Sequence, residues 1–244
     1  AQVSLFGESS SIQFPEPEIP PCENWGAMEK LAREKEVVGI YISGHPLDDF
    51  KIEMKNFCNG TITSFENLEL LINKEITFGG VITDVEHRVS RHGKGWATFT
   101  IEDYTNNHEF KIFGEEYLKF RHFLMLNNFV YVRSIVRDGW INRETGKKGA
   151  PRIQFNNFQL LHDVINAYAK KLSIQLSLNG INEVIIDELQ ELFKMHKGNN
   201  SLNFVIYDDE DSIKVNLKSR KQKIKISQEL LSHLDSRKVF YKLN

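Results

Sequence analysis

Two stretches decide the fold: residues 76–87 read ITFGGVITDVEH, and residues 96–103 read WATFTIED. Both alternate apolar and polar side chains, which is typical of a β-strand with one buried face. In the second stretch, one face carries Ala97, Phe99 and Ile101. The adjacent Gly79 and Gly80 predict a bulge or a sharp bend in the first strand.

Three more strands and one helix follow these two stretches. Strand patterns cover residues 108–113, 128–137 and 152–161, and residues 114–126 have helical spacing. Five strands with one helix between the third and the fourth is the order of the OB-fold, a small, partly open barrel. We therefore predict a five-stranded OB-fold β-barrel over residues 74–163 that closes most of its own edges.

The last part of the chain, residues 164–244, mixes helical and strand patterns. We predict strands at residues 171–178, 202–207, 213–217, 223–226 and 239–243, and helices at residues 181–197 and 228–234. This order predicts a small C-terminal α+β domain.

The first 73 residues differ in composition from the rest. They carry five basic against twelve acidic residues, and residues 7–21 hold four of the six prolines, so this run is interpreted as a linker or an extended arm. Residues 25–38 have one apolar helical face and end at Gly39, and residues 48–57 predict a second short helix. The fold class is therefore α+β multidomain, with a helical N-terminal segment before the barrel.

Composition limits the classes of function. The chain has 244 residues, 41% hydrophobic residues and a net charge of −2, which excludes binding to nucleic acid by bulk charge alone. No apolar run reaches the length of about 20 residues that a membrane helix needs. Cys22 and Cys58 lack metal-ligand spacing, which favours a reducing cytoplasm. A first residue Ala1 leads us to expect a piece of a longer protein.

No catalytic motif is present in the sequence: it contains no GxSxG, HExxH, GxxxxGK[ST] or GxGxxG opening a helix. The acidic run at residues 208–211 could hold a divalent ion, but adjacent residues in a strand turn point to opposite sides, so we interpret it as a solvated hairpin tip. Binding is therefore better supported than catalysis.

The exposed face of the second and third strands is the predicted binding surface. OB-folds engage single strands there by base stacking and by charge from the rim loops. The predicted contact residues for single-stranded DNA are Trp96, Thr98, Lys111 and Phe113 on the face, and Arg91, Lys94, Arg143, Lys147 and Lys148 in two rim loops. The alternative is that Trp96 and Phe113 lie under a neighbouring domain.

Residues 2–6 (QVSLF) form a compact peptide anchor, because Leu5 and Phe6 would fill an apolar pocket and Gln2 would fix the orientation. This pentapeptide resembles the sliding-clamp-binding motif of bacterial replication proteins. Residues 34–48 (EKEVVGIYISGHPLD) resemble the EKExxGxYxSGHPLD signature of the bacterial replicative DNA polymerase III alpha subunit. In that family, the signature lies between the clamp-binding motif and an OB domain, and a tau-binding domain comes last.

The resemblance implies a domain order and a set of partners. Residues 1–24 would be the clamp-binding peptide and linker, residues 25–73 the helical end of the clamp-binding domain, and residues 164–244 the domain that binds the tau subunit of the clamp loader. Gln2, Leu5 and Phe6 would bind the sliding clamp, and the OB-fold would contact single-stranded template DNA. The chain would extend to the natural end of the alpha subunit at Asn244.

The parent protein would be a DNA-directed DNA polymerase, a cytoplasmic nucleotidyltransferase. The resemblance places its catalytic aspartates and Mg²⁺ ions upstream of Ala1, so this chain would have no catalytic residues, metal or cofactor of its own. Two other classes remain open from the residues: an OB-fold RNA or anticodon-binding module, and an interaction scaffold that binds only protein.

Overall fold

The computed structural model describes residues 24–139, 148–208 and 213–244, and the chain divides into two compact units, residues 1–44 and residues 45–244. In the first unit, α1 (Ala27–Val38) ends at Gly39, whose φ of 86° is left-handed and suits a residue without a Cβ. No residue of α1 is buried.

Glu34 organises the turn that follows α1. Its carboxylate accepts hydrogen bonds from the backbone N–H groups of Ile42 and Ser43 at 2.9 and 2.8 Å, and from the Ser43 hydroxyl. These bonds, led by the one from the hydroxyl, lower the pKa of Glu34. The glutamate and the serine of the signature at residues 34–48 are thus local structural partners.

The second unit begins with the histidine and proline of the same signature. His45 Nδ1 accepts a hydrogen bond from the N–H of Leu47 at 3.1 Å, and the Asp48 carboxylate accepts one from the N–H of His45 at 2.9 Å. These two reciprocal bonds form a capping box at the N-terminus of the 3₁₀ helix η1 (Pro46–Phe50). Pro46 stands at the first position of this helix, where its missing N–H costs nothing.

Helix occupies only part of the segment that we predicted to be helical. After η1, α2 (Lys51–Phe57) has seven residues, and the 3₁₀ turns η2 (Ile62–Glu66) and η3 (Leu68–Leu71) lead into the first strand. Among the described residues, no helix is both long enough and apolar enough to cross a membrane.

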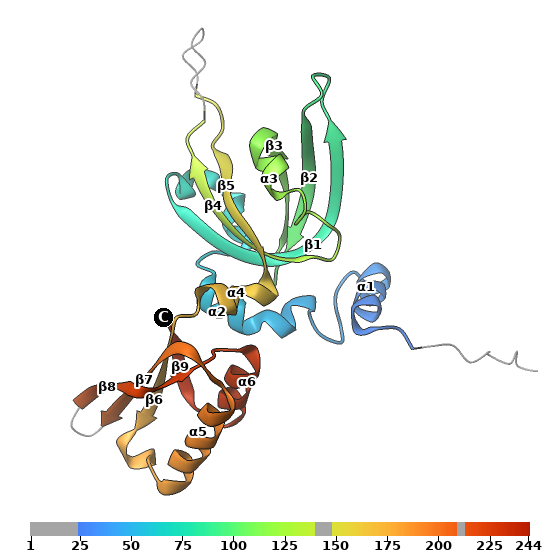
Figure 1. Cartoon of the computed structure of the whole chain (residues 1–244). Helices are drawn as coiled ribbons and strands as arrows, with labels where there is room; N and C mark the ends of the chain where they lie inside the picture. Colours follow the sequence, from blue (N-terminus) through green and yellow to red (C-terminus); the bar gives the residue numbers. More distant parts are fainter. Residues whose placement is uncertain (1–23, 140–147, 209–212) are drawn as a thin grey trace, which may run out of the picture. The chain divides into compact units, whose positions relative to one another are not determined.

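A five-stranded antiparallel sheet forms the middle of the chain. Its strands are β1 (Glu75–Val89), β2 (Gly95–Glu102), β3 (Asn107–Phe113), β4 (Phe129–Arg137) and β5 (Arg152–Leu160), in the spatial order β3-β2-β1-β4-β5. The helix α3 (Gly114–Phe120) joins β3 to β4 and is shorter than the predicted residues 114–126. The long central β1 curves strongly and pairs with both β2 and β4 (Figure 1).

The OB-fold-like sheet that we predicted is present, but it is not closed into a barrel: in the described residues, β3 and β5 are the two edges of the sheet and do not pair with each other. The helix α3 packs against β2, β3 and β5, so it stands where a closing strand pair would be. Glu116 of α3 accepts a hydrogen bond from the N–H of Phe155 at 3.2 Å, which satisfies one donor of the open β5 edge. The sheet therefore has the OB-fold strand order without hydrogen-bonded closure.

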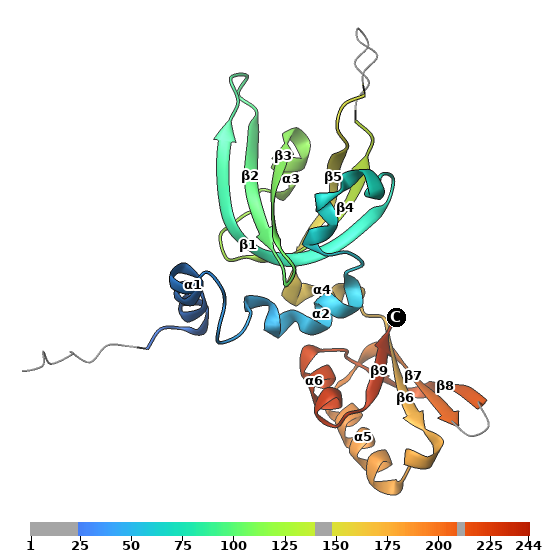
Figure 2. The same cartoon turned by 180° about the vertical axis from the view of Figure 1, so that it is seen from behind.

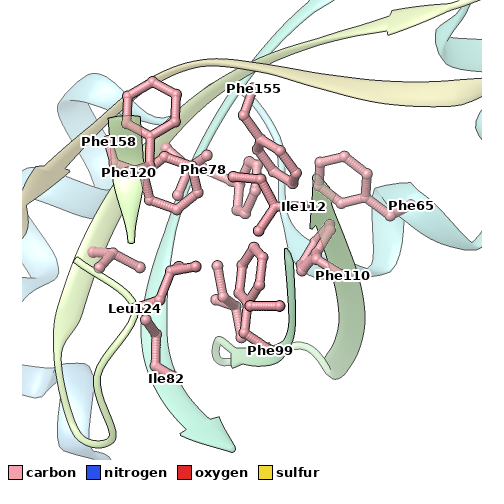
Figure 3. Close-up of a cluster of buried hydrophobic side chains, with 14 of the residues drawn as sticks. Phe65, Phe78, Ile82, Phe99, Phe110, Ile112, Phe120, Leu124, Phe155 and Phe158 are labelled. Atoms are coloured by element: carbon pink, nitrogen blue, oxygen red, sulfur yellow. The ribbon is translucent and has the colours of Figure 1, made fainter. Parts of the chain in front are cut away.

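Phenylalanine side chains fill the inside of the curved sheet (Figure 3). Phe99 is fully buried, and its ring centroid lies 5.6 Å from that of Phe110, 5.8 Å from that of Phe155 and 6.1 Å from that of Phe158. The buried Ala97, Phe99 and Ile101 confirm the face predicted for residues 96–103.

The glycine pair does not mark the bulge. The register of β1 with β2 shifts between Ile82 and Asp84, three residues beyond the position that we predicted. Gly80 is instead a site of close packing, because a Cβ there would lie 2.6 Å from the carbonyl oxygen of Glu102 and collide with the Ile101 side chain.

The C-terminal region forms a four-stranded sheet with helices on it. The strands are β6 (Lys171–Ser177), β7 (Lys197–Asp208), β8 (Ile213–Ile224) and β9 (Phe240–Leu243), in the order β8-β7-β6-β9, with only the β6–β7 pair parallel. The 3₁₀ turn η4 (Leu178–Gly180), α5 (Glu183–Met195) and α6 (Gln228–Ser236) complete it. This arrangement is the small α+β region that the sequence predicted.

Two details of this region correct the sequence prediction. Residues 213–217 and 223–226 were predicted as separate strands, but β8 is continuous, with a register shift between β7 residues Ser201 and Asn203 that absorbs the polar residues 219–222. The helix α4 (Leu161–Tyr168) was not predicted, and it buries Leu161, Val164 and Ile165.

Helices α2 and α4 pack together next to β4. A small cluster of Leu47, Tyr131, Leu161 and Val164 holds them, with Met54 and Phe57 of α2 at its margin. Ile52 and Phe57 also pack against the core of the C-terminal sheet. The short helix α2 therefore contributes side chains to two separate cores.

Candidate nucleic-acid interface

The outer face of β1, β2 and β3 carries an aromatic row next to the loop at residues 90–94. In the register of the sheet, Trp96 lies between Arg88 on β1 and Phe113 on β3. The rings of Trp96 and Phe113 are stacked, with centroids 5.4 Å apart and an interplanar angle of 18°. The Arg88 guanidinium carbon lies 5.4 Å from the Trp96 centroid, within cation–π range.

The row is exposed to different degrees along its length. Phe113 is 56% exposed, whereas Trp96 is half-buried between its two neighbours. The alternation that buries Ala97 and Phe99 places Trp96 and Thr98 on the opposite face of β2, as predicted. The exposed ring of Phe113 is a surface that either a nucleic-acid base or a neighbouring domain could cover, so both interpretations of Trp96 and Phe113 stay predictions.

Two further rows on the same face carry mixed charge. The second row is Glu86, Thr98 and Lys111, and the third row is Asp84, Thr100 and Glu109. Lys111 pairs with Glu109 at 3.4 Å, and Arg88 pairs with Glu86 at 2.5 Å. The Arg88 hydrogen bond lowers the pKa of Glu86, and Glu86 in turn raises the pKa of Arg88. Repulsion of phosphate therefore grows with distance from the aromatic row.

The rim loops place some predicted cations beside the aromatic row. Arg91 and Lys94 are exposed in a turn that Ser90 closes by accepting from Gly93 N at 2.9 Å and, through its hydroxyl, from Lys94 N at 3.1 Å. Lys148 is exposed and pairs with Asp138 at 2.8 Å.

Several predicted site residues lie outside the described residues. Arg143 and Lys147 belong to the second rim loop, and Gln2, Leu5 and Phe6 belong to the N-terminal segment. Their roles remain predictions.

Sequence reasoning missed Arg88 and the three carboxylates of the face, Asp84, Glu86 and Glu109. The strand predicted at residues 76–87 ends one residue before Arg88, whereas β1 continues to Val89. Asp84, Glu86 and Arg88 follow each other at the strand period of two, which is the signal that would have placed them on one face. Glu109 lies two residues before Lys111 on β3, so the same period of two would have placed it on this face; only its position opposite Thr100 required the register of β2 and β3.

Two family models match the chain. Residues 76–166 match a model described as an OB-fold nucleic acid binding domain, and residues 172–244 match one described as the C-terminal domain of the DNA polymerase III alpha subunit. The fold and these matches define a replication-polymerase segment that combines an OB-fold domain with a C-terminal α+β domain. The chain belongs to the DNA polymerase III alpha subunits and corresponds to a C-terminal portion of them.

Curated relatives agree with this assignment. The chain is similar to DNA polymerase III subunit alpha of Buchnera aphidicola (26% identity over 75% of this chain and 15% of the relative), of Campylobacter jejuni (36% over 46% and 9%) and of Bacillus subtilis (23% over 88% and 18%). The chain thus spans less than a fifth of the length of these relatives.

Solved structures show only a distant likeness. The mitochondrial single-stranded DNA binding protein Rim1 of S. cerevisiae aligns over 36% of this chain and 95% of its own, with 13% identity and a TM-score of 0.26. A structure of RecG bound to a three-way DNA junction aligns over 60% of this chain and 20% of its own, with 17% identity and a TM-score of 0.25. These scores add nothing to the assignment.

Proposed function

We propose that this part of an alpha subunit binds single-stranded DNA on the outer face of β1–β3 and tethers the polymerase to the sliding clamp and the clamp loader. The observation that carries the DNA contact is the row of Arg88, Trp96 and Phe113 beside the basic turn at residues 90–94. A stacked aromatic pair next to cations is the combination by which OB-folds bind single strands.

The exposed ring of Phe113 offers a surface on which an unpaired base can stack. Base–aromatic stacking is worth about 1–3 kcal/mol per base and tolerates any sequence, because every base has a π-face. Arg91 and Lys94 lie in the adjacent turn and would contact the phosphates on either side of that base. The contact would cover a few nucleotides only.

The acidic rows limit how far a strand can run across the face. Asp84, Glu86 and Glu109 would repel phosphate, so we expect weak intrinsic affinity that salt reduces further. A weak contact is useful when the domain is tethered to an enzyme that is already on the template. Tethering raises the effective concentration of the domain near the DNA to roughly the millimolar range. This is the setting of a domain within a polymerase subunit.

The tethering roles depend on the ends of the chain. Gln2, Leu5 and Phe6 would bind the sliding clamp, and residues 164–244 would bind the tau subunit of the clamp loader. The two motifs quoted from the sequence and the match of residues 172–244 support these roles. Nucleotidyl transfer with its Mg²⁺ ions, in the cytoplasm, would belong to parts of the alpha subunit outside this chain.

Fluorescence anisotropy with a labelled 20-nucleotide oligo-dT tests the DNA contact. Phe113→Ala and Trp96→Ala should each weaken binding by about 5- to 100-fold, the equivalent of one lost stacking contact. Phe240→Ala is the matched control, because Phe240 is 71% exposed on β9 of the other sheet. Unchanged oligo-dT affinity in both variants would favour the protein-only scaffold, and tighter binding of structured tRNA would favour the RNA-binding module.

A further inference from the structure

The outer edge of β8 is an exposed amphipathic strand. β8 is an edge of the C-terminal sheet and pairs only with β7 in the described structure (Figure 2). Its side chains are exposed along nearly the whole strand. An edge strand leaves every second N–H and C=O group free to pair with another chain.

The side chains of β8 divide into an apolar set and a cationic set. Ile213, Val215 and Leu217 alternate along the strand and are 55%, 45% and 47% exposed. The cationic side chains of the strand are Lys214, Lys218, Arg220, Lys221 and Lys223, and no acidic residue occurs in residues 213–224. Among the residues that the structure describes, no carboxylate forms an ion pair with any of these five cations.

A register shift limits the length of the usable edge. β7 passes from Ser201 to Asn203 while β8 passes from Lys223 to Lys218, so residues 219–222 of β8 have no paired residue on β7. Within this irregular part of the strand, Gln222 N donates to Ser219 Oγ at 3.2 Å. The regular edge therefore comprises residues 213–218, long enough to pair with a short strand.

We propose that the outer edge of β8 binds an extended protein segment of alternating acidic and apolar residues, which adds to the sheet as a fifth strand. Backbone groups of residues 213–218 would provide the ladder, Val215 and Leu217 would contact the apolar side chains of the segment, and Lys214 and Lys218 would face its carboxylates. The exposed aliphatic side chains favour a peptide over a nucleic acid, because phosphates and bases gain little from them.

The alternative without a ligand is that the cationic side chains of β8 only prevent this open edge from pairing with other chains and aggregating. The inference goes beyond the clamp-loader contact proposed above, because it names the strand edge that binds and the kind of segment that it binds. It does not depend on which protein carries that segment. It is also independent of the DNA contact on β1–β3, so failure of either one leaves the other standing.

Fluorescence anisotropy on the full 244-residue chain tests the proposal with two labelled octapeptides, EVEIEVEI and KVKIKVKI. We expect the acidic peptide to bind at least about tenfold more tightly than the basic one. Methylation of alternate backbone nitrogens on one edge of the acidic peptide should abolish binding, and methylation on its other edge should not, because only one edge can pair with β8.

Substitutions then locate the site. Lys214→Glu combined with Lys218→Glu should weaken the acidic peptide about tenfold, and Val215→Thr combined with Leu217→Thr about threefold. Lys194→Glu is the matched control, because Lys194 is an exposed cation on α5. Circular dichroism checks that each variant is folded.

Three results would overturn the proposal. The first is equal binding of both peptides, or binding of neither. The second is binding of the acidic peptide that is retained both when one edge is N-methylated and when the other edge is N-methylated. The third is binding of oligo-dT that Lys214→Glu with Lys218→Glu removes but Val215→Thr with Leu217→Thr leaves intact, which would make β8 a nucleic-acid surface.

Discussion

The two sheets of the second unit bury their apolar side chains in different ways. The β1–β5 sheet curls around a phenylalanine-rich core to which α3 and η2 also contribute side chains (Figure 3). Helices α2 and α4 pack against the outer side of β1 and β4, whereas the outer face around Trp96 and Phe113 stays exposed. The C-terminal sheet has a mainly aliphatic core to which α5 and α6 contribute Leu192 and Leu230. The first sheet therefore offers a face for binding, whereas the second offers an edge.

The largest expected effect tests the phenylalanine core. Phe99→Ala should destabilise the protein by about 3–5 kcal/mol, because it removes a fully buried ring that lies within 6.1 Å of three others. Phe113→Ala should change stability by less than about 1 kcal/mol, since Phe113 is 56% exposed. Urea unfolding measures both. Equal losses would show that the outer aromatic row stabilises the sheet as much as the interior does.

The second prediction tests the close packing within the curved sheet. Gly80→Ala should cost about 1–3 kcal/mol, because its Cβ would lie 2.6 Å from the Glu102 carbonyl oxygen, which is fixed backbone. Gly180→Ala in the C-terminal region should cost under about 0.5 kcal/mol, because the nearest atom to the new Cβ is 3.8 Å away. Thermal unfolding of the two variants distinguishes them, and a neutral Gly80→Ala would mean that β1 can move away from β2.

The faces of the strands could be predicted from the sequence, but the edges could not. Alternation alone assigns Phe99 to the interior and Trp96 to the exterior, because side-chain direction repeats every two residues. Edge pairing depends on contacts between residues far apart in the chain, so neither the open β3 and β5 edges nor the continuity of β8 could be found from local pattern. The helix α4 was missed because Leu161 also continues the apolar pattern of β5.

The third prediction concerns the helix that serves both cores. Glu53 on α2 is 1% exposed, its Oε2 atom has no hydrogen-bond partner in the described structure, and burial raises its pKa. A raised pKa means that the folded protein binds the proton more tightly, so Glu53 destabilises the fold as pH rises above the ordinary value of 4.5. The cost is fully present above the folded pKa and vanishes well below 4.5.

Glu53→Gln should therefore stabilise the protein by about 1 kcal/mol at pH 8 and have little effect at pH 3. Urea unfolding at a series of pH values measures this difference. Glu69→Gln is the control, because Glu69 is exposed on η3. A stability difference that is independent of pH would show that the pKa of Glu53 is the same in the folded and unfolded states. The fold would then tolerate the charge of Glu53 on α2.

The smallest expected effect tests the mixed charge of the β1–β3 face. Glu109→Gln removes the partner of Lys111, which lies 3.4 Å away, and should raise the affinity for oligo-dT about two- to fivefold at low salt, because one repulsive charge is lost and one cation is released. Stability should not change, since both side chains are exposed. Glu229→Gln on α6 is the matched control, remote in sequence and exposed. If both variants raise the affinity for oligo-dT equally, the net charge of the chain controls DNA binding, and the position of the charge on the β1–β3 face does not. The charge pattern would then no longer distinguish a binding face on the first sheet from a binding edge on the second.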